Sequence, residues 1–166
     1  MNIKEYQIAE KLAEKQIEQL IEFSNSDPEI LANTRDAERF KDRKGFDVWI
    51  SKPKKIFVLT NDDQDLLGII WFPKSTLALD KRYGIGFAIR IYPPARGKGL
   101  SRSFTNEAIE RLKQTDFYKN IPNKGIFLDS LIQNKKAHSL YEKLGFKEIG
   151  EKDGRIVMIL DELTMQ

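Results

Sequence analysis

The ten residues PPARGKGLSR (93–102) combine positive charge with small side chains, directly after a run of alternating apolar residues. The segment supplies three cations and two glycines: Arg96, Lys98, Arg102, Gly97 and Gly99. The cations attract an anion, and the glycines let its oxygens reach the backbone. Where a helix begins, the first amides are unpaired and the dipole is positive, which favours the same ligand. We therefore expect a loop that binds a diphosphate, with a basic loop that only caps a helix as the alternative.

Two common phosphate-binding motifs do not fit this segment. A P-loop needs a lysine followed by serine or threonine, whereas Gly99 follows Lys98. A dinucleotide-binding turn needs a third glycine, and the chain has Ser101 and Arg102 at that point. The spacing thus excludes both motifs.

A second segment, NKKAHSLYEKLGF (134–146), places a tyrosine on the apolar face of an expected helix. That face consists of Ala137, Leu140, Tyr141 and Leu144. Gly145 ends the helix in a Schellman-type turn. Taken alone, the pattern needs no function, because Tyr141 fits a hydrophobic core equally well. His138, the only histidine, lies one position off this face, and we expect it to be exposed.

The elements around these segments follow from their periodicity. Six segments are typical of strands: 54–60, 66–72, 85–91, 125–131, 146–151 and 155–160. Polar turns join the first two and the last two into hairpins. Residues 5–12 are either a further short strand or a helical turn. The pattern therefore predicts a mixed sheet of six or seven strands.

Helical spacing appears at three further places. A helix from Ile17 reaches Ser24, and Pro28 ends it or opens the next one. A second helix begins at Thr34 and is interrupted by Gly45. A third helix directly follows the glycine-rich loop, with Leu100, Phe104, Ala108 and Leu112 on its apolar face. The loop is therefore a strand-to-helix turn.

Composition describes one ordinary globular domain over residues 1–166, with 40% hydrophobic and 32% charged residues. Cysteine is absent, which excludes disulfides and thiolate chemistry and is compatible with a cytoplasmic protein. We expect neither a signal peptide nor a membrane span. The net charge of +3 is too small to indicate a nucleic-acid partner, but residues 90–102 contain four cations and no acid.

Together, the two segments resemble the signatures of the GCN5-related N-acetyltransferase (GNAT) superfamily. Residues 96–101 match its acetyl-CoA motif, after the strand residues Ile89 and Ile91. The second signature is matched by Asn134, Ala137, Leu140, Tyr141, Gly145 and Phe146. The resemblance extends from about residue 54 to 160. One departure is Ser101, which stands where the family usually has glycine or alanine, so its side chain must turn away from the pyrophosphate or hydrogen-bond to it.

The resemblance implies an α/β fold, namely a mixed, mostly antiparallel six- to seven-stranded sheet flanked by helices. It implies acetyl-CoA as co-substrate and no metal. The residues that it assigns to acetyl-CoA are Ile89, Arg90, Ile91, Arg96, Gly97, Lys98, Gly99, Leu100, Ser101, Asn134 and Lys136. Backbone groups near Ile89 to Ile91 would pair with the pantetheine arm like an added strand.

The resemblance also implies two catalytic residues. Tyr141 would protonate the departing thiolate, and Asp129, twelve residues earlier, is similar in placement to the acidic base of one branch of the family. A solvent-facing strand acid is the alternative for Asp129. We expect His138 to take no part.

Other functions remain open from the sequence. One is transfer of another acyl group, and another is a non-catalytic module that only binds CoA. A nucleic-acid-binding domain would use residues 35–55, with eight Lys/Arg against four Asp/Glu, together with the loop. The expected partners are acetyl-CoA and an amine acceptor, with a homodimer as an optional assembly and no membrane. The acceptor groove of the fold would fall at residues 13–50 and 146–160, where no motif identifies the acceptor.

Overall fold

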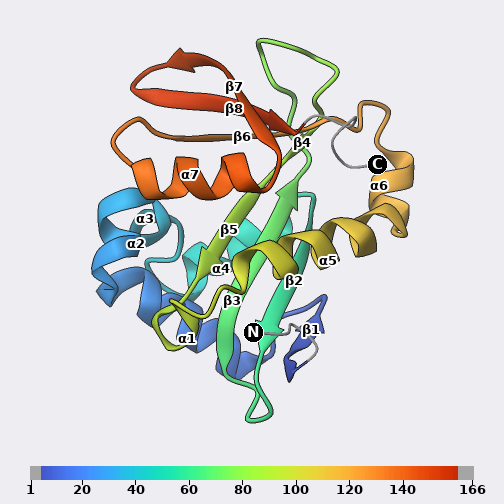
Figure 1. The fold of residues 1–166 in the computed structure, drawn as a ribbon. Coiled ribbons are helices and arrows are strands. Elements are labelled where there is room, and N and C mark those ends of the chain that lie inside the picture. Colours follow the sequence, from blue (N-terminus) through green and yellow to red (C-terminus); the bar gives the residue numbers. More distant parts are fainter. Residues whose placement is uncertain (1–4, 161–166) are drawn as a thin grey trace.

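The computed structural model describes residues 5–160, and within them eight strands form two four-stranded sheets (Figure 1). The first sheet has the order β1 (Gln7–Ala9), β2 (Lys54–Thr60), β3 (Leu66–Pro73), β5 (Ala88–Ile91), with antiparallel pairs throughout. The second has the order β4 (Ile85–Gly86), β6 (Ile126–Leu131), β8 (Arg155–Leu160), β7 (Phe146–Lys152), with β4 and β6 parallel. The expected mixed, mostly antiparallel fold is confirmed.

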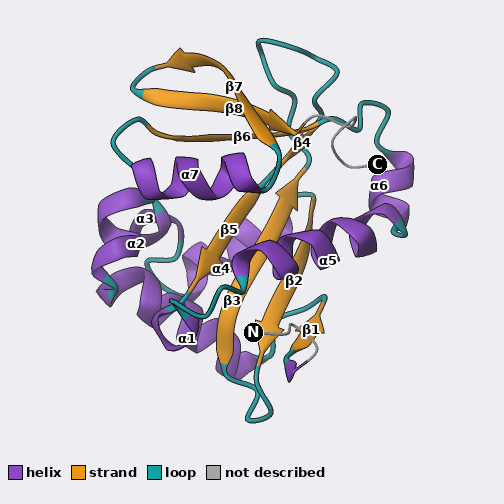
Figure 2. Cartoon of the chain, viewed as in Figure 1, coloured by secondary structure: helices purple, strands orange, loops and turns teal. Residues whose placement is uncertain are grey.

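The strand predicted at 85–91 is divided between the two sheets. Its first part pairs with β6 through Ile85–Ile126 and Gly86–Phe127, and its second part pairs with β3. Beyond Gly86, no strand lies opposite β5 on the β6 side, so the two sheets diverge there (Figure 2). This division, together with the short strand β1, raises the number of strands above the six or seven expected.

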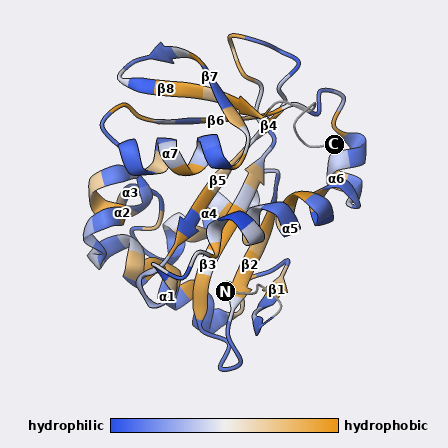
Figure 3. Ribbon diagram, viewed as in Figure 1, coloured by the Kyte–Doolittle hydropathy of each residue, from blue (hydrophilic) through white to orange (hydrophobic). Residues whose placement is uncertain are grey.

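Helices cover both faces of the first sheet. One face packs against α1 (Glu14–Ser26), α2 (Pro28–Asn33), α3 (Asp36–Arg39) and α4 (Arg43–Ser51), and the core between them is rich in aromatic residues. The other face packs against α5 (Ser101–Lys113), and α7 (Lys135–Lys143) borders the same core; α6 (Asp116–Asn120) follows α5. Both central strands are apolar along their length because each face is buried, whereas the outer helical surfaces are hydrophilic (Figure 3).

The N-terminal helices differ in part from the prediction. Pro28 opens α2, and the Asp27 side chain caps that helix by accepting a hydrogen bond from the Glu29 amide. The helix expected from Thr34 is only the single turn α3, which ends before Phe40. The prediction that Gly45 interrupts a helix is wrong: Gly45 lies inside α4, because its amide donates 2.9 Å to Asp42, the cap of that helix.

Candidate active site

A cleft of about 1390 Å³ opens where the two sheets diverge. Its walls come from β5 and β6, the loop before α5, the first turns of α7, the α2–α3 region and the β7–β8 turn. The two segments singled out in the sequence therefore border one cavity. Most of the predicted site residues line it, but Lys98 is exposed outside the lining.

The backbone of β5 presents free donors to this cleft. The Tyr92 amide donates 2.9 Å to Leu67 O on β3, and alternate residues of a strand face opposite sides, so the amides of Ile89 and Ile91 face away from β3. The carbonyls of these two residues point the same way, and each accepts a hydrogen bond of 2.9 Å, from Arg90 and Arg96 respectively. Two amides therefore remain available to a ligand that extends along β5.

The loop before α5 has the backbone form that an anion requires. Gly97 and Gly99 adopt φ values of +75° and +68°, which favour glycine, and a Cβ at either position would meet no described atom within 4 Å. Within residues 5–160, no group accepts a hydrogen bond from the amides of residues 97–103. Leu100 is buried beneath the loop, and Ser101 begins α5 at the cleft wall. These residues fit the diphosphate of acetyl-CoA.

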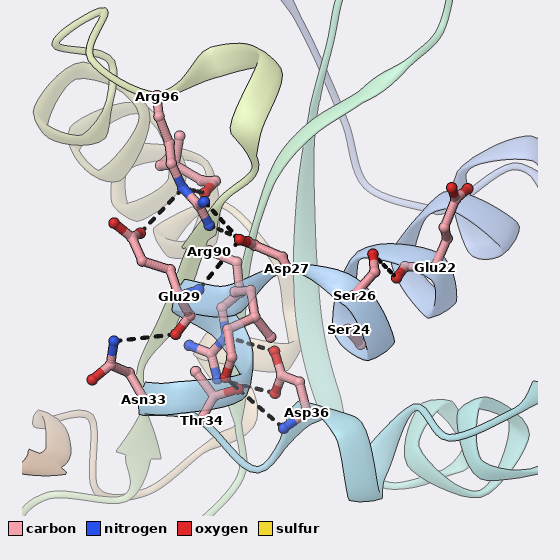
Figure 4. Close-up of polar contacts among 12 residues, drawn as sticks. Glu22, Ser24, Ser26, Asp27, Glu29, Asn33, Thr34, Asp36, Arg90 and Arg96 are labelled. Carbon is pink, nitrogen blue, oxygen red and sulfur yellow. Dashed lines mark hydrogen bonds and ion pairs between the residues drawn. The ribbon is translucent and has the colours of Figure 1, made fainter.

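The side chain of Arg96 is turned toward the helices. Its Nη1 donates 2.9 Å to Asp27, its Nη2 bonds the second oxygen of the same carboxylate, and its Nε lies 3.2 Å from Glu29 (Figure 4). The side chain of Asp27 is 3% exposed. Arg96 therefore fastens the loop to the α1–α2 junction. The charges that face solvent at the loop are Lys98 and Arg102, which make no ion pair with a described residue.

A second arginine, Arg90 on β5, makes a contact that the sequence did not indicate. Arg90 donates to the buried carboxylate of Asp36, with Nε–Oδ2 at 2.7 Å and Nη2–Oδ1 at 3.1 Å (Figure 4). Its guanidinium also lies over the ring of Trp71. Because Asp36 precedes Arg90 by 54 residues, no local pattern could have revealed the pair.

Tyr141 lies on α7 with its ring toward the core and lines the cleft. The ring packs edge-on against Phe87 and Phe146, at centroid distances of 6.4 and 6.1 Å. Burial raises the pKa of Tyr141 above its ordinary value of 10, although the nearby positive charges of Arg90 and Arg155 oppose that shift. The phenol therefore stays protonated near neutral pH, the form that a proton donor needs.

Asp129 projects from β6 on the side opposite the core residue Leu128. Its Oδ1 accepts a hydrogen bond of 2.8 Å from Arg155 Nε on the neighbouring strand β8. The carboxylate is half exposed and lines the cleft. Asp129 and Tyr141 therefore border the same cavity, and the charge of Asp129 acts on the Tyr141 hydroxyl.

The first turn of α7 holds the remaining predicted residues. Asn134 caps the helix by accepting a hydrogen bond from the Ala137 amide at 3.4 Å, and the exposed Lys136 lies 3.3 Å from Glu29. The expectation that His138 is exposed is wrong: it is 9% exposed and is the buried residue of α7, whereas the apolar stripe beside it is only partly buried. Its Nε2 has no hydrogen-bond partner among the described residues. His138 does not line the cleft.

The described residues also exclude two other features. Between residues 5 and 160, no three histidine, aspartate or glutamate side chains are grouped to hold a metal ion. In the same range, no helix has the length and apolar character needed to cross a membrane. The arrangement is an open strand edge, an anion-binding loop and a protonated phenol around one cleft.

Comparison with solved structures supports the fold. A chimera of spermidine N-acetyltransferase from Vibrio cholerae and hSSAT has a TM-score of 0.69 at 20% identity, covering 97% of this chain and 98% of the other. The Vibrio cholerae enzyme in complex with CoA and spermine gives 0.67 at 20% identity, covering 94% of both. A dodecameric form of that enzyme gives 0.61 at 20% identity, covering 95% and 92%.

No curated protein matches the sequence. A model of the acetyltransferase (GNAT) family, by contrast, matches residues 16–146, which include the glycine-rich loop, the diverging strands and Tyr141. The chain belongs to the GNAT family of N-acetyltransferases, which use acetyl-CoA as co-substrate.

Proposed function

We propose that this protein acetylates a primary amine by direct attack on acetyl-CoA, with both substrates bound where β5 and β6 diverge. The observation that carries the proposal is the pair of unpaired amides at Ile89 and Ile91, which lie in the same cleft as the anion-binding loop and Tyr141. The loop amides and the open positions at Gly97 and Gly99 suit the diphosphate.

Each residue then has a defined task. The amide of Ile89 donates a hydrogen bond to the thioester carbonyl and stabilises the negative charge that develops there. The amine nitrogen bonds to the carbonyl carbon as the carbon–sulfur bond breaks, and Tyr141 gives its proton to the departing sulfur. Asp129 accepts the proton that the amine loses, directly or through water. Asn134 and Lys136 in the lining of the cleft, and the exposed Lys98 of the loop, complete the proposed binding set.

The test is release of thiol from acetyl-CoA across a panel of primary amines, with the acetylated amine identified by mass spectrometry. Wild-type protein should release thiol only when an amine is present. Binding of acetyl-CoA without turnover of any amine would instead support a module that only binds CoA.

Assembly and location are separate proposals. Oligomerisation is supported by the dodecameric form of a similar structure, and light scattering during size-exclusion chromatography would test it. A cytoplasmic site of action is compatible with the absence of cysteine from the sequence. A single domain over residues 1–166 is supported by the length and composition of the chain.

A further inference from the structure

The acceptor side of the cleft is the face that looks toward the α2–α3 region. On β6 and β8, Leu128, Ile156 and Met158 point into the core beneath α5, so Asp129, Arg155 and Val157 point to the opposite face. Arg90 on β5 also points there, because it contacts Asp36 and Trp71. An amine that reaches the diverging strands from this side passes these side chains.

This face carries more positive than negative charge. Four arginines line it: Arg35, Arg39, Arg90 and Arg155. Two carboxylates contact them, namely the buried Asp36, which pairs with Arg39 and Arg90, and Asp129, which pairs with Arg155. Within this group of six side chains, four guanidinium groups against two carboxylates leave an excess of two positive charges.

Two of the arginines have donors to spare. Arg35 is exposed, and its guanidinium makes no hydrogen bond or ion pair with any residue between 5 and 160, although its carbonyl accepts from the amides of Glu38 and Arg39. Arg39 uses only Nη1, at 2.8 Å from Asp36, and lies over the Trp71 ring at 5.6 Å with its side chain 34% exposed. A guanidinium held by an aromatic face with free nitrogen donors is suited to bind a carboxylate.

The electrostatics of Arg39 agree with this geometry. Burial lowers its pKa, the charge of Asp36 opposes that effect, and the nearby charges of Arg90 and Arg35 lower the pKa further. A bound anion would offset both the burial and the repulsion among the three arginines.

The carboxylates of the cleft offer little to a polycation. Three acids line it, and two are already paired: Glu29 with Arg96 and Lys136, and Asp129 with Arg155. Asp153, in the exposed turn between β7 and β8, is the one acid of the described lining without an ion pair. A polyamine would bring several ammonium groups to a face whose net charge repels them.

We propose that the acceptor amine also carries an anionic group, foremost a carboxylate, which Arg35 and Arg39 bind while the amine reaches the diverging strands. The acceptor is then an amino acid or a related amino acid derivative, not a polyamine. This inference rests on the proposed function and adds the chemical class of its substrate.

The experiment compares kcat/KM for amines that differ only in the anionic group. Suitable pairs are lysine with cadaverine, tyrosine with tyramine, and phosphoethanolamine with ethanolamine; amino acid α-amides and spermidine complete the set. Charge-assisted hydrogen bonds predict a preference of roughly 10- to 100-fold for the anionic member of the best pair. In an amino acid α-amide, a neutral amide replaces the α-carboxylate. If amidation abolishes the preference, the bound group is a free α-carboxylate. If amidation leaves kcat/KM unchanged, the bound group is a carboxylate or phosphate elsewhere in a larger acceptor.

Variants connect the preference with the two arginines. Arg35→Glu should abolish the preference and improve turnover of the diamines, and Arg39→Gln should weaken it. Lys41→Gln is the matched control, because Lys41 is an exposed cation close to α3 that does not line the cleft. A merely structural role would lower the activity on both members of a pair equally.

Two results would overturn the inference. One is faster turnover of cadaverine than of lysine, or of spermidine than of every anionic amine in the set. The other is an unchanged preference in both arginine variants. If no amine is turned over, the proposed function fails. Calorimetric binding of the same pairs to the CoA-loaded protein then still measures the preference.

Discussion

Arg96 and Asp27 form an ion pair across 69 residues of sequence, with Nη1–Oδ1 at 2.9 Å (Figure 4). The cation that the sequence assigns to the diphosphate is therefore engaged with the α1–α2 junction. Arg96 also holds the Ile91 carbonyl, so one side chain connects β5, the loop and the helices. Under the proposed function, Arg96 would therefore contribute to acetyl-CoA binding through the shape that it gives the loop.

The first prediction concerns this pair in the absence of ligand. Arg96→Ala leaves the buried Asp27 carboxylate without its partner and should lower the free energy of unfolding by about 2 kcal/mol, less than for a fully buried pair because Arg96 reaches solvent. Urea denaturation measures it. The double variant Asp27→Asn, Arg96→Met should recover most of the loss, since asparagine still caps α2. Equal instability of both variants would contradict the ion-pair explanation.

The second prediction uses two glycines with the same backbone conformation. Gly99 and Gly154 have φ values of +68° and +76°, and a Cβ at either meets no described atom within 4 Å. Alanine at each should therefore destabilise the fold by a similar amount, about 1–2 kcal/mol. Only Gly99→Ala should lose the rise in melting temperature caused by acetyl-CoA, because only there does the methyl group meet the diphosphate. If acetyl-CoA raises the melting temperature of both variants equally, the loop is not part of the acetyl-CoA site.

The third prediction is that Tyr141→Phe lowers kcat by about 10² to 10⁴ and leaves the Kd for acetyl-CoA unchanged. Because burial raises the Tyr141 pKa above 10, the phenol stays protonated up to at least pH 9. The ratio of wild-type to variant kcat should therefore be constant from pH 7 to pH 9. A ratio that shrinks over this interval would mean that the phenol loses its proton earlier, and a kcat within a factor of three of wild type would return Tyr141 to a packing role.

The fourth prediction concerns Asp129. An amine acceptor is mostly protonated at neutral pH when its pKa is well above 7, so a base matters most there. Asp129→Asn should lower kcat/KM steeply at pH 7 and recover partly as the pH approaches the pKa of the acceptor amine. A loss that is the same at every pH would assign Asp129 to positioning. Arg155→Met is the companion variant, because it removes the hydrogen bond to Asp129 and keeps the carboxylate.

Local patterns predicted the parts of the fold that depend on neighbouring residues. Apolar periodicity and turn residues predicted both hairpins at the positions where the structure has them. They also predicted the strand before the loop and the helix after it. The prediction failed where a tertiary contact determines the bounds of an element. The strand 85–91 is divided because β6 accompanies only its first two residues, and β6 comes forty residues later.

The candidate site could likewise be predicted only where its residues belong to a local motif. The loop glycines and Tyr141 could be found from their spacing, because a motif of a few residues carries both. The arginine partners Asp27 and Asp36 could not, since each lies more than fifty residues from its cation along the chain. His138 was predicted to be exposed because it lies one position off the apolar face of its helix, whereas it is the buried residue of α7.

The division of the strand at Gly86 also determines which parts of the protein can unfold independently. Among the described residues, the backbone link between the two sheets is the single bridge Lys74–Ile85, together with the continuous chain from β4 to β5. Gly86 lies so close to Pro73 that a Cβ would come within 2.8 Å of its ring. Few backbone contacts therefore connect the two sheets. In the free protein, hydrogen exchange should show the two sheets opening as separate cooperative units. A ligand bound between the sheets should make their amides exchange as one unit.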